Sequence, residues 1–223
     1  MSIDKGPEDF SYMSPIPEDQ FENVESAFKH SEEGCVSAKK WLISYYEDHD
    51  QPQKAFALRV ELARQFLVYQ KKLEESKSQP AFYESIYLVP ENERGSKKQV
   101  FRVAECYEIG HGVQVSIPDA VYWYGECVAF EKKALVRLAN IYLTTVEFVH
   151  NKKAKLAAFN LLCHAQNAYE DCPHERASIE KIKRMFFDTF GEYTYRSFMF
   201  WLAPISVEAC YEDIYSVTPH KCL

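Results

Sequence analysis

Apolar residues recur every three to four positions along most of this chain, which is the period of an amphipathic α-helix. In the N-terminal third the pattern predicts three short helices, with Gly34 separating the first two and Pro52 opening the third. Their apolar positions are Phe21, Val24, Ala27 and Phe28; then Ala38, Trp41, Leu42, Tyr45 and Tyr46; then Ala55, Leu58, Leu62, Phe66 and Tyr69. Polar and charged residues fill the opposite faces.

Residues 74–96 interrupt this period, because Pro80, Pro90 and Gly95 lie in a polar segment around a short apolar run. We interpret the segment as an inserted loop. Helical stripes resume beyond it, at Val100–Tyr107, Ala120–Cys127, Ala134–Tyr142, Ala154–Ala165 and Ile179–Phe186. Within this part, Ser116 is expected to cap the helix that contains Pro118 and Asp119, since Ser caps well, Pro fits the first turn and an acid suits the positive end of the helix dipole.

Two stretches of the second half repeat the same spacing within their helices. Tyr107 and Tyr142 are equivalent positions 35 residues apart, and Ala120 and Ala158 are equivalent positions 38 residues apart. The second copy is therefore expected to have a loop three residues longer. A degraded third copy lies around residues 38–58. A period in this range is typical of a helical solenoid.

The first of these copies resembles the Sel-like repeat, a relative of the tetratricopeptide repeat. Seven residues match the pattern of that family: Tyr107, Gly110, Gly112, Val113, Ala120, Trp123 and Tyr124. Ala104, Ser116 and Asp119 depart from it, replacing the usual Gly, Asp and Lys. The resemblance covers residues 35–70 and 97–168, and its two loop glycines are expected to take positive φ. It implies a protein-binding adaptor and not an enzyme.

The predicted fold is therefore all-α, an α/α solenoid of antiparallel helix pairs. We divide the chain into an irregular arm (1–16), N-terminal helical repeats (17–73), the inserted loop (74–96), Sel-like repeats (97–168) and C-terminal capping helices (169–223). The composition agrees, because only 7 Gly in 223 residues disfavour the turn-rich sheet folds and leave no glycine-rich phosphate loop.

Charge and cysteine content limit the classes of function. The net charge is −7, and residues 1–50 hold twelve acidic residues against four basic ones, so nucleic acid is a poor candidate partner. No apolar run approaches the ~18 residues of a membrane span, and no signal peptide is apparent. The seven cysteines are odd in number and form no CxxC, which favours reduced thiols in the cytoplasm.

The histidines and cysteines suggest one competing hypothesis, an enzyme with a Cys/His site in a helical cleft. Its residues would be Cys163, His164, Cys172 and His174, and it requires that these four converge. None of them has zinc-finger spacing, and Cys163 and His164 are adjacent on a helix and point in different directions. We therefore expect no catalytic residue, no cofactor and no metal.

Acidic and aromatic residues outside the repeats are the candidate contacts with a partner. These are Asp4, Glu8, Asp9, Tyr12, Glu18, Asp19, Phe82, Tyr83 and Tyr87. Acidic residues would steer a partner with a basic surface, and exposed Tyr is favoured at interfaces. Our specific hypothesis is an immunity protein that binds and neutralises a cognate bacterial toxin. A regulatory or secreted adaptor or effector, and a structural subunit that assembles with itself, remain alternatives.

Overall fold

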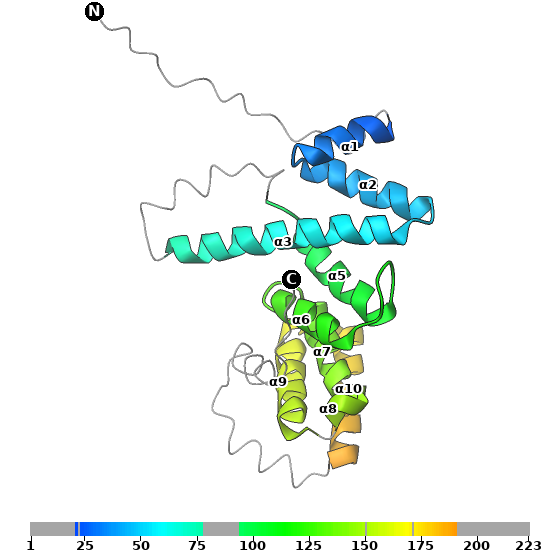
Figure 1. The fold of residues 1–223 in the computed structure, drawn as a ribbon. Coiled ribbons are helices and arrows are strands. Elements are labelled where there is room, and N and C mark those ends of the chain that lie inside the picture. The colour runs from blue at the N-terminus through cyan, green and yellow to red at the C-terminus, as the bar shows by residue number, and fades with distance from the viewer. Residues whose placement is uncertain (1–20, 22, 78–93, 150, 171, 191–223) are drawn as a thin grey trace, which may run out of the picture. The chain divides into compact units, whose positions relative to one another are not determined.

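A computed structural model describes residue 21 and residues 23–77, 94–149, 151–170 and 172–190. The described residues form helices joined by turns and short linkers, with no strand among them, so the all-α prediction is confirmed. The chain divides into two compact units, residues 1–96 (unit 1) and residues 97–223 (unit 2). Figure 1 labels the helices of the two units.

Unit 1 contains α1 (Val24–Glu32), α2 (Val36–Asp48) and α3 (Pro52–Lys77), and each helix packs against the next. Asn23 caps α1 by accepting a hydrogen bond from the backbone N–H of Ser26. The buried core lies between the helices and includes Ala27, Ala38, Leu42 and Leu62. The apolar stripes of the sequence thus face one another across the helix pairs.

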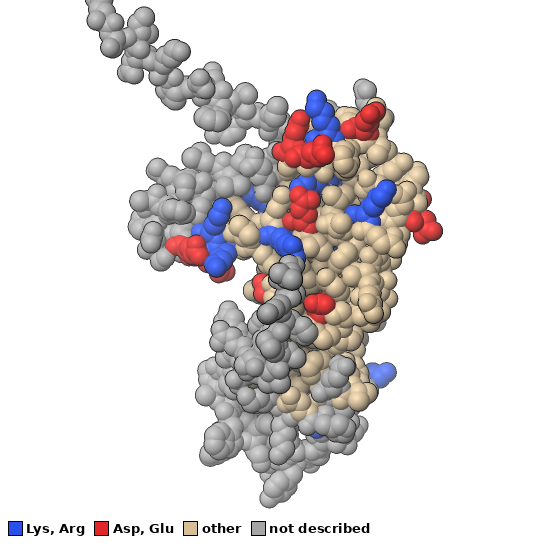
Figure 2. All heavy atoms as spheres, in the orientation of Figure 1, with Lys and Arg blue, Asp and Glu red and all other residues tan. Residues whose placement is uncertain are grey.

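Two ion pairs join α2 to α3, one with its basic residue on α2 and the other with its basic residue on α3. Lys39 on α2 donates to Glu61 on α3, and Arg59 on α3 donates to Glu47 on α2. Lys39 is only 2% exposed, so its ammonium group depends on the Glu61 carboxylate for the interaction that water would otherwise provide. Elsewhere over unit 1, the face shown in Figure 2 has acidic and basic side chains interspersed.

The backbone at Gly95 lies directly against α3. The N–H of Ser96 donates to the carbonyl of Leu62, and a Cβ atom on Gly95 would lie 2.4 Å from the nitrogen of Phe66 and 2.5 Å from that carbonyl oxygen. Gly95 also has a φ of +72°. Only glycine satisfies both conditions, so this close approach holds the 94–96 segment against α3.

Unit 2 begins with α5 (Lys97–Ile109) and α6 (Ile117–Cys127), which pack together as a pair. A second pair follows, α7 (Lys132–Thr144) and α9 (Lys152–Ala168), with the short α8 (Val146–Val149) between them. Helix α10 (Pro173–Phe190) contacts both α9 and α7, and Figure 1 shows these three lying side by side. The core of unit 2 is rich in fully buried alanines, among them Ala104, Ala139 and Ala158.

The linker between α5 and α6 has the geometry predicted for it. Gly110 and Gly112 take φ of +79° and +74°, and Ser116 accepts a hydrogen bond from the N–H of Asp119 at 3.4 Å to cap α6. In the same repeat, Tyr107 is half-buried and Trp123 is buried. These local predictions are confirmed.

Three expectations need correction. The linkers 110–116 and 145–151 are equally long, so the three additional residues of the second copy extend the N-terminal end of α9 instead of its loop. Phe28, assigned to an apolar stripe, is 49% exposed, whereas the neighbouring Ala27 is fully buried. Helix α3 continues to Lys77, beyond residue 74 where the inserted loop was predicted to begin.

We expect Gly95→Ala to destabilise unit 1 much more than Gly34→Ala. Both glycines have positive φ, which costs alanine about 1–2 kcal/mol, but nothing lies within 4 Å of a Cβ at Gly34. The backbone clash at Gly95 adds about 1–3 kcal/mol. Urea denaturation of the two full-length variants measures the difference, and equal losses would show that the 94–96 segment moves away from α3 at little cost.

Glu126→Gln is expected to stabilise the protein at pH 7. Burial raises the pKa of Glu126, so its protonated form contributes stability that is fully present below about pH 4 and is lost as pH rises through the folded-state value. Gln removes the buried charge. The melting temperature should therefore rise at pH 7 and not at pH 4, and Glu170→Gln, at an exposed site, is the control. A gain at both pH values would exclude ionisation of Glu126 as the cause.

Candidate functional site

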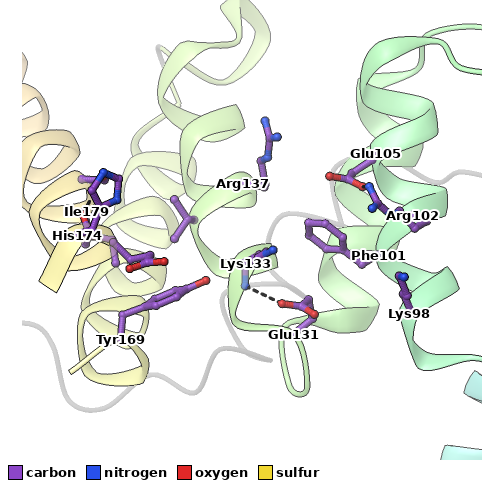
Figure 3. A pocket seen from close by; sticks show the side chains of 13 residues that line it. Lys98, Phe101, Arg102, Glu105, Glu131, Lys133, Arg137, Tyr169, His174 and Ile179 are labelled. Carbon is purple, nitrogen blue, oxygen red and sulfur yellow. Dashed lines mark hydrogen bonds and ion pairs between the residues drawn. The ribbon is translucent and has the colours of Figure 1, made fainter. Parts of the chain in front are cut away.

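A groove on unit 2 is the strongest candidate for a functional site. It has a volume of about 490 Å³ and is lined by residues of α5, α7 and α10, together with Glu131 before α7 and Tyr169 after α9 (Figure 3). Helices α6 and α9, which alternate with these three in the sequence, contribute no lining residue. Helices α5, α7 and α10 therefore each present one face to the groove.

The floor of the groove is apolar. Phe101 from α5, Tyr169 and Ile179 from α10 are each less than 10% exposed, and half-buried Val136 from α7 lies among the lining residues. The ring of Phe101 packs against the buried ring of Tyr124, with centroids 5.4 Å apart, which fixes its position. Helices α5, α7 and α10 thus each supply one apolar side chain to the floor of the groove.

The rim of the groove is charged. Lys98 and Arg102 come from α5, Lys133 and Arg137 come from α7, and all four are exposed. Three acidic residues also line it: Glu105, Glu131 and Glu175. An apolar floor with a charged rim resembles the anatomy of protein interfaces, in which a desolvated centre is surrounded by polar groups.

A hydrogen-bonded network beneath the rim holds α5, α6 and α7 together. The hydroxyl of Tyr124 on α6 donates to Oε2 of Glu108 on α5, and Arg137 on α7 lies 3.6 Å from Oε1 of the same carboxylate. Burial is the main cause that raises the pKa of Tyr124, and its hydrogen bond to Glu108 is the next. Tyr124 therefore stays a neutral donor, and Arg137 joins the network to the groove.

Tyr169 closes the floor at the junction of α9 and α10. The ammonium group of Lys132 lies 4.4 Å from the centroid of its ring, and burial, followed by the charge of Glu131, raises the pKa of the hydroxyl. A tyrosine with a raised pKa is a neutral group at physiological pH. Its role in the groove is therefore packing and hydrogen bonding rather than proton abstraction.

The four residues of the enzyme hypothesis do not form a metal-binding group. Across the described ranges, which include all four, no three His, Cys, Asp or Glu side chains lie close enough to hold a metal ion. His174 lines the groove, whereas Cys163, His164 and Cys172 are not among its lining residues. Burial raises the pKa of the Cys163 thiol, which is the opposite of the shift that activates a nucleophilic cysteine.

The nine candidate contact residues named from the sequence lie outside the described residues, since they fall within 1–20 and 78–93. Sequence reasoning also missed the groove. One signal was present: Lys98, Phe101 and Arg102 recur 35 residues later as Lys133, Val136 and Arg137, which is the spacing of Tyr107 and Tyr142. Equivalent positions of two repeats therefore line the same groove.

Glu108→Ala is expected to cost about 1–3 kcal/mol of unfolding free energy, because it leaves the buried hydroxyl of Tyr124 without its acceptor. Glu108→Gln keeps an acceptor oxygen and should retain most of the stability. Urea denaturation compares the two variants. If Gln and Ala are equally damaging, the charge pair with Arg137, and not the hydrogen bond, is the important contact.

Comparisons with protein-family models, with curated proteins and with solved structures give no match. Among the described residues, none of the helices combines the length and the apolar character needed to cross a membrane.

Proposed function

We propose that this chain is a non-enzymatic protein-binding module and that the groove of unit 2 is its contact surface. The observation that carries the proposal is the combination of an apolar floor from three helices with a rim of exposed charges. Such a surface offers burial to an apolar side chain and pairing to polar ones. Burial raises the pKa of half-buried Cys163 and of buried Tyr169, which gives little support to a nucleophilic cysteine or to a tyrosine base in this unit.

The finer fold assignment belongs to the same proposal. We infer that unit 2 is a short α/α solenoid of Sel-like repeats, with α5 and α7 as the first helices of two repeats and α6 and α9 as the second. The 35-residue recurrence and the contact of α10 with α7 as well as α9 support it. In a solenoid the first helices line a continuous concave face, and extended concave faces are the binding surfaces of repeat proteins.

Within this class we propose an immunity protein that acts in the cytoplasm and neutralises a toxin by binding it. The supporting observations are the small size of the chain, its degenerate repeats and the free thiols of the described cysteines, which suit a reducing compartment. The acidic residues of the N-terminal segment would add a second contact, with a basic surface of the same partner.

We expect Val136→Gln to weaken partner binding about tenfold, because it places a polar side chain without charge on the apolar groove floor. Val146→Gln is the matched control: it makes the same change in unit 2 at a position that is 80% exposed and does not line the groove. A partner captured by the full-length protein from the source organism is identified and titrated against both variants by calorimetry. Equal affinities would remove the groove as the contact surface.

The toxin hypothesis has its own test. The captured partner is expressed in host cells alone, with the wild-type chain, and with Val136→Gln. Growth arrest by the partner, rescue by the wild-type chain and loss of rescue by the variant are expected. A partner that leaves growth unaffected would exclude the immunity function and leave a regulatory adaptor.

A further inference from the structure

Two successive repeats present a lysine, an apolar side chain and an arginine to the groove at equivalent positions. Lys98, Phe101 and Arg102 lie on α5, and Lys133, Val136 and Arg137 lie at the equivalent positions of α7. Both sets line the groove, and Figure 3 shows the two lysines and the two arginines projecting from their respective helices. The groove therefore carries a Lys–apolar–Arg triplet in duplicate.

The acidic residues of the groove already have roles within the fold. Glu105 accepts a hydrogen bond from Arg102 at 2.6 Å, and Glu131 caps α7 by accepting one from the backbone N–H of Lys133 at 3.2 Å. Glu175 lies in the first turn of α10, where the helix dipole favours a negative charge.

The basic residues, in contrast, are available to a ligand. The ammonium groups of Lys98 and Lys133 have no hydrogen bond or ion pair within the described part of the chain. The side chains of Arg102 and Arg137 are each 50% exposed. A guanidinium group has five N–H donors, so a ligand carboxylate can bind the donors that face solvent while Glu105 and Glu108 keep theirs.

We propose that the groove binds an extended acidic peptide segment of the partner, with one or more apolar side chains between its carboxylates. This inference rests on the proposed function and adds the chemistry of the ligand. The carboxylates would pair with the two sets of basic side chains, and the apolar side chains would cover Phe101 and Val136. Arginine in each triplet offers a two-pronged hydrogen-bond donor that matches a carboxylate.

The test selects from random twelve-residue peptides displayed on phage, using the full-length chain as bait. Peptides that bind the wild-type chain but not Val136→Gln, a change that leaves the charge of the groove unaltered, are sequenced, which restricts the readout to the groove. We expect them to be enriched in Asp and Glu, with an apolar residue between acidic ones. Neutral or basic groove-dependent peptides would overturn the inference and leave the proposed function standing, whereas the absence of any groove-dependent peptide would overturn both.

Charge reversal measures the contribution of the lysines. Lys98→Glu/Lys133→Glu should weaken binding of the selected synthetic peptides at least about 30-fold, and the wild-type affinity should fall as salt is raised. The matched control is Lys181→Glu/Arg184→Glu, which makes the same charge change at exposed positions of α10 outside the groove. Equal effects of the two double variants would overturn the inference, because they would reduce it to the net charge of the protein.

Discussion

One carboxylate, that of Glu108, determines how three helices of unit 2 meet beneath the groove. It accepts the hydrogen bond of the buried Tyr124 hydroxyl on α6 and pairs with Arg137 on α7, while its own backbone belongs to α5. Apolar packing is non-directional and allows helices to slide past one another with small losses, whereas a hydrogen bond to a charged acceptor has a defined geometry. The apolar core therefore supplies most of the stability of this unit, and Glu108 specifies its register. The groove depends on that register, because Phe101 packs on Tyr124 and Arg137 forms part of the rim.

The same division between burial and specific contacts is found in unit 1. Ala27, Ala38, Leu42 and Leu62 provide the buried area, and the Lys39–Glu61 and Arg59–Glu47 pairs align α2 with α3. Lys39 is nearly inaccessible, so a shift of α3 that separated it from Glu61 would leave a buried charge unpaired, which costs several kcal/mol. Gly95 adds a steric constraint at the Leu62–Phe66 turn of α3, since no other residue lets the backbone approach so closely. In each unit the apolar core would thus tolerate several helix registers, and a few polar or steric contacts select one of them.

The sequence predicted the helices well because helix formation leaves local signals. Each of these signals involves residues that lie within one or two helical turns of one another. They are the apolar period, Pro52 at the start of α3, Ser116 as a cap and the two loop glycines. The errors have local causes too. The extension of α9 follows from Asn151, whose Oδ1 accepts a hydrogen bond from the N–H of Ala154 and so caps the helix earlier than the repeat spacing suggested. The groove was missed for a different reason: the apolar period identifies the buried face of each helix, but it carries no information on which polar faces of separate helices converge.

Some buried positions of unit 2 differ between the two copies of the repeated spacing. Trp123 and Tyr124 of the first repeat correspond to Leu161 and Leu162 of the second, and all four are buried. A core position needs apolar volume and a fitting shape, so such exchanges are tolerated when neighbours repack. Lys98 and Lys133 show the opposite behaviour. They are identical in the two repeats although both are exposed and neither makes a side-chain hydrogen bond or ion pair within the described residues. Packing does not require a lysine at either position, and many other polar residues would be tolerated at an exposed position of a helix. A shared requirement outside the fold, namely a negatively charged ligand that spans both repeats, accounts for the identity of the two lysines and for the arginines that accompany them.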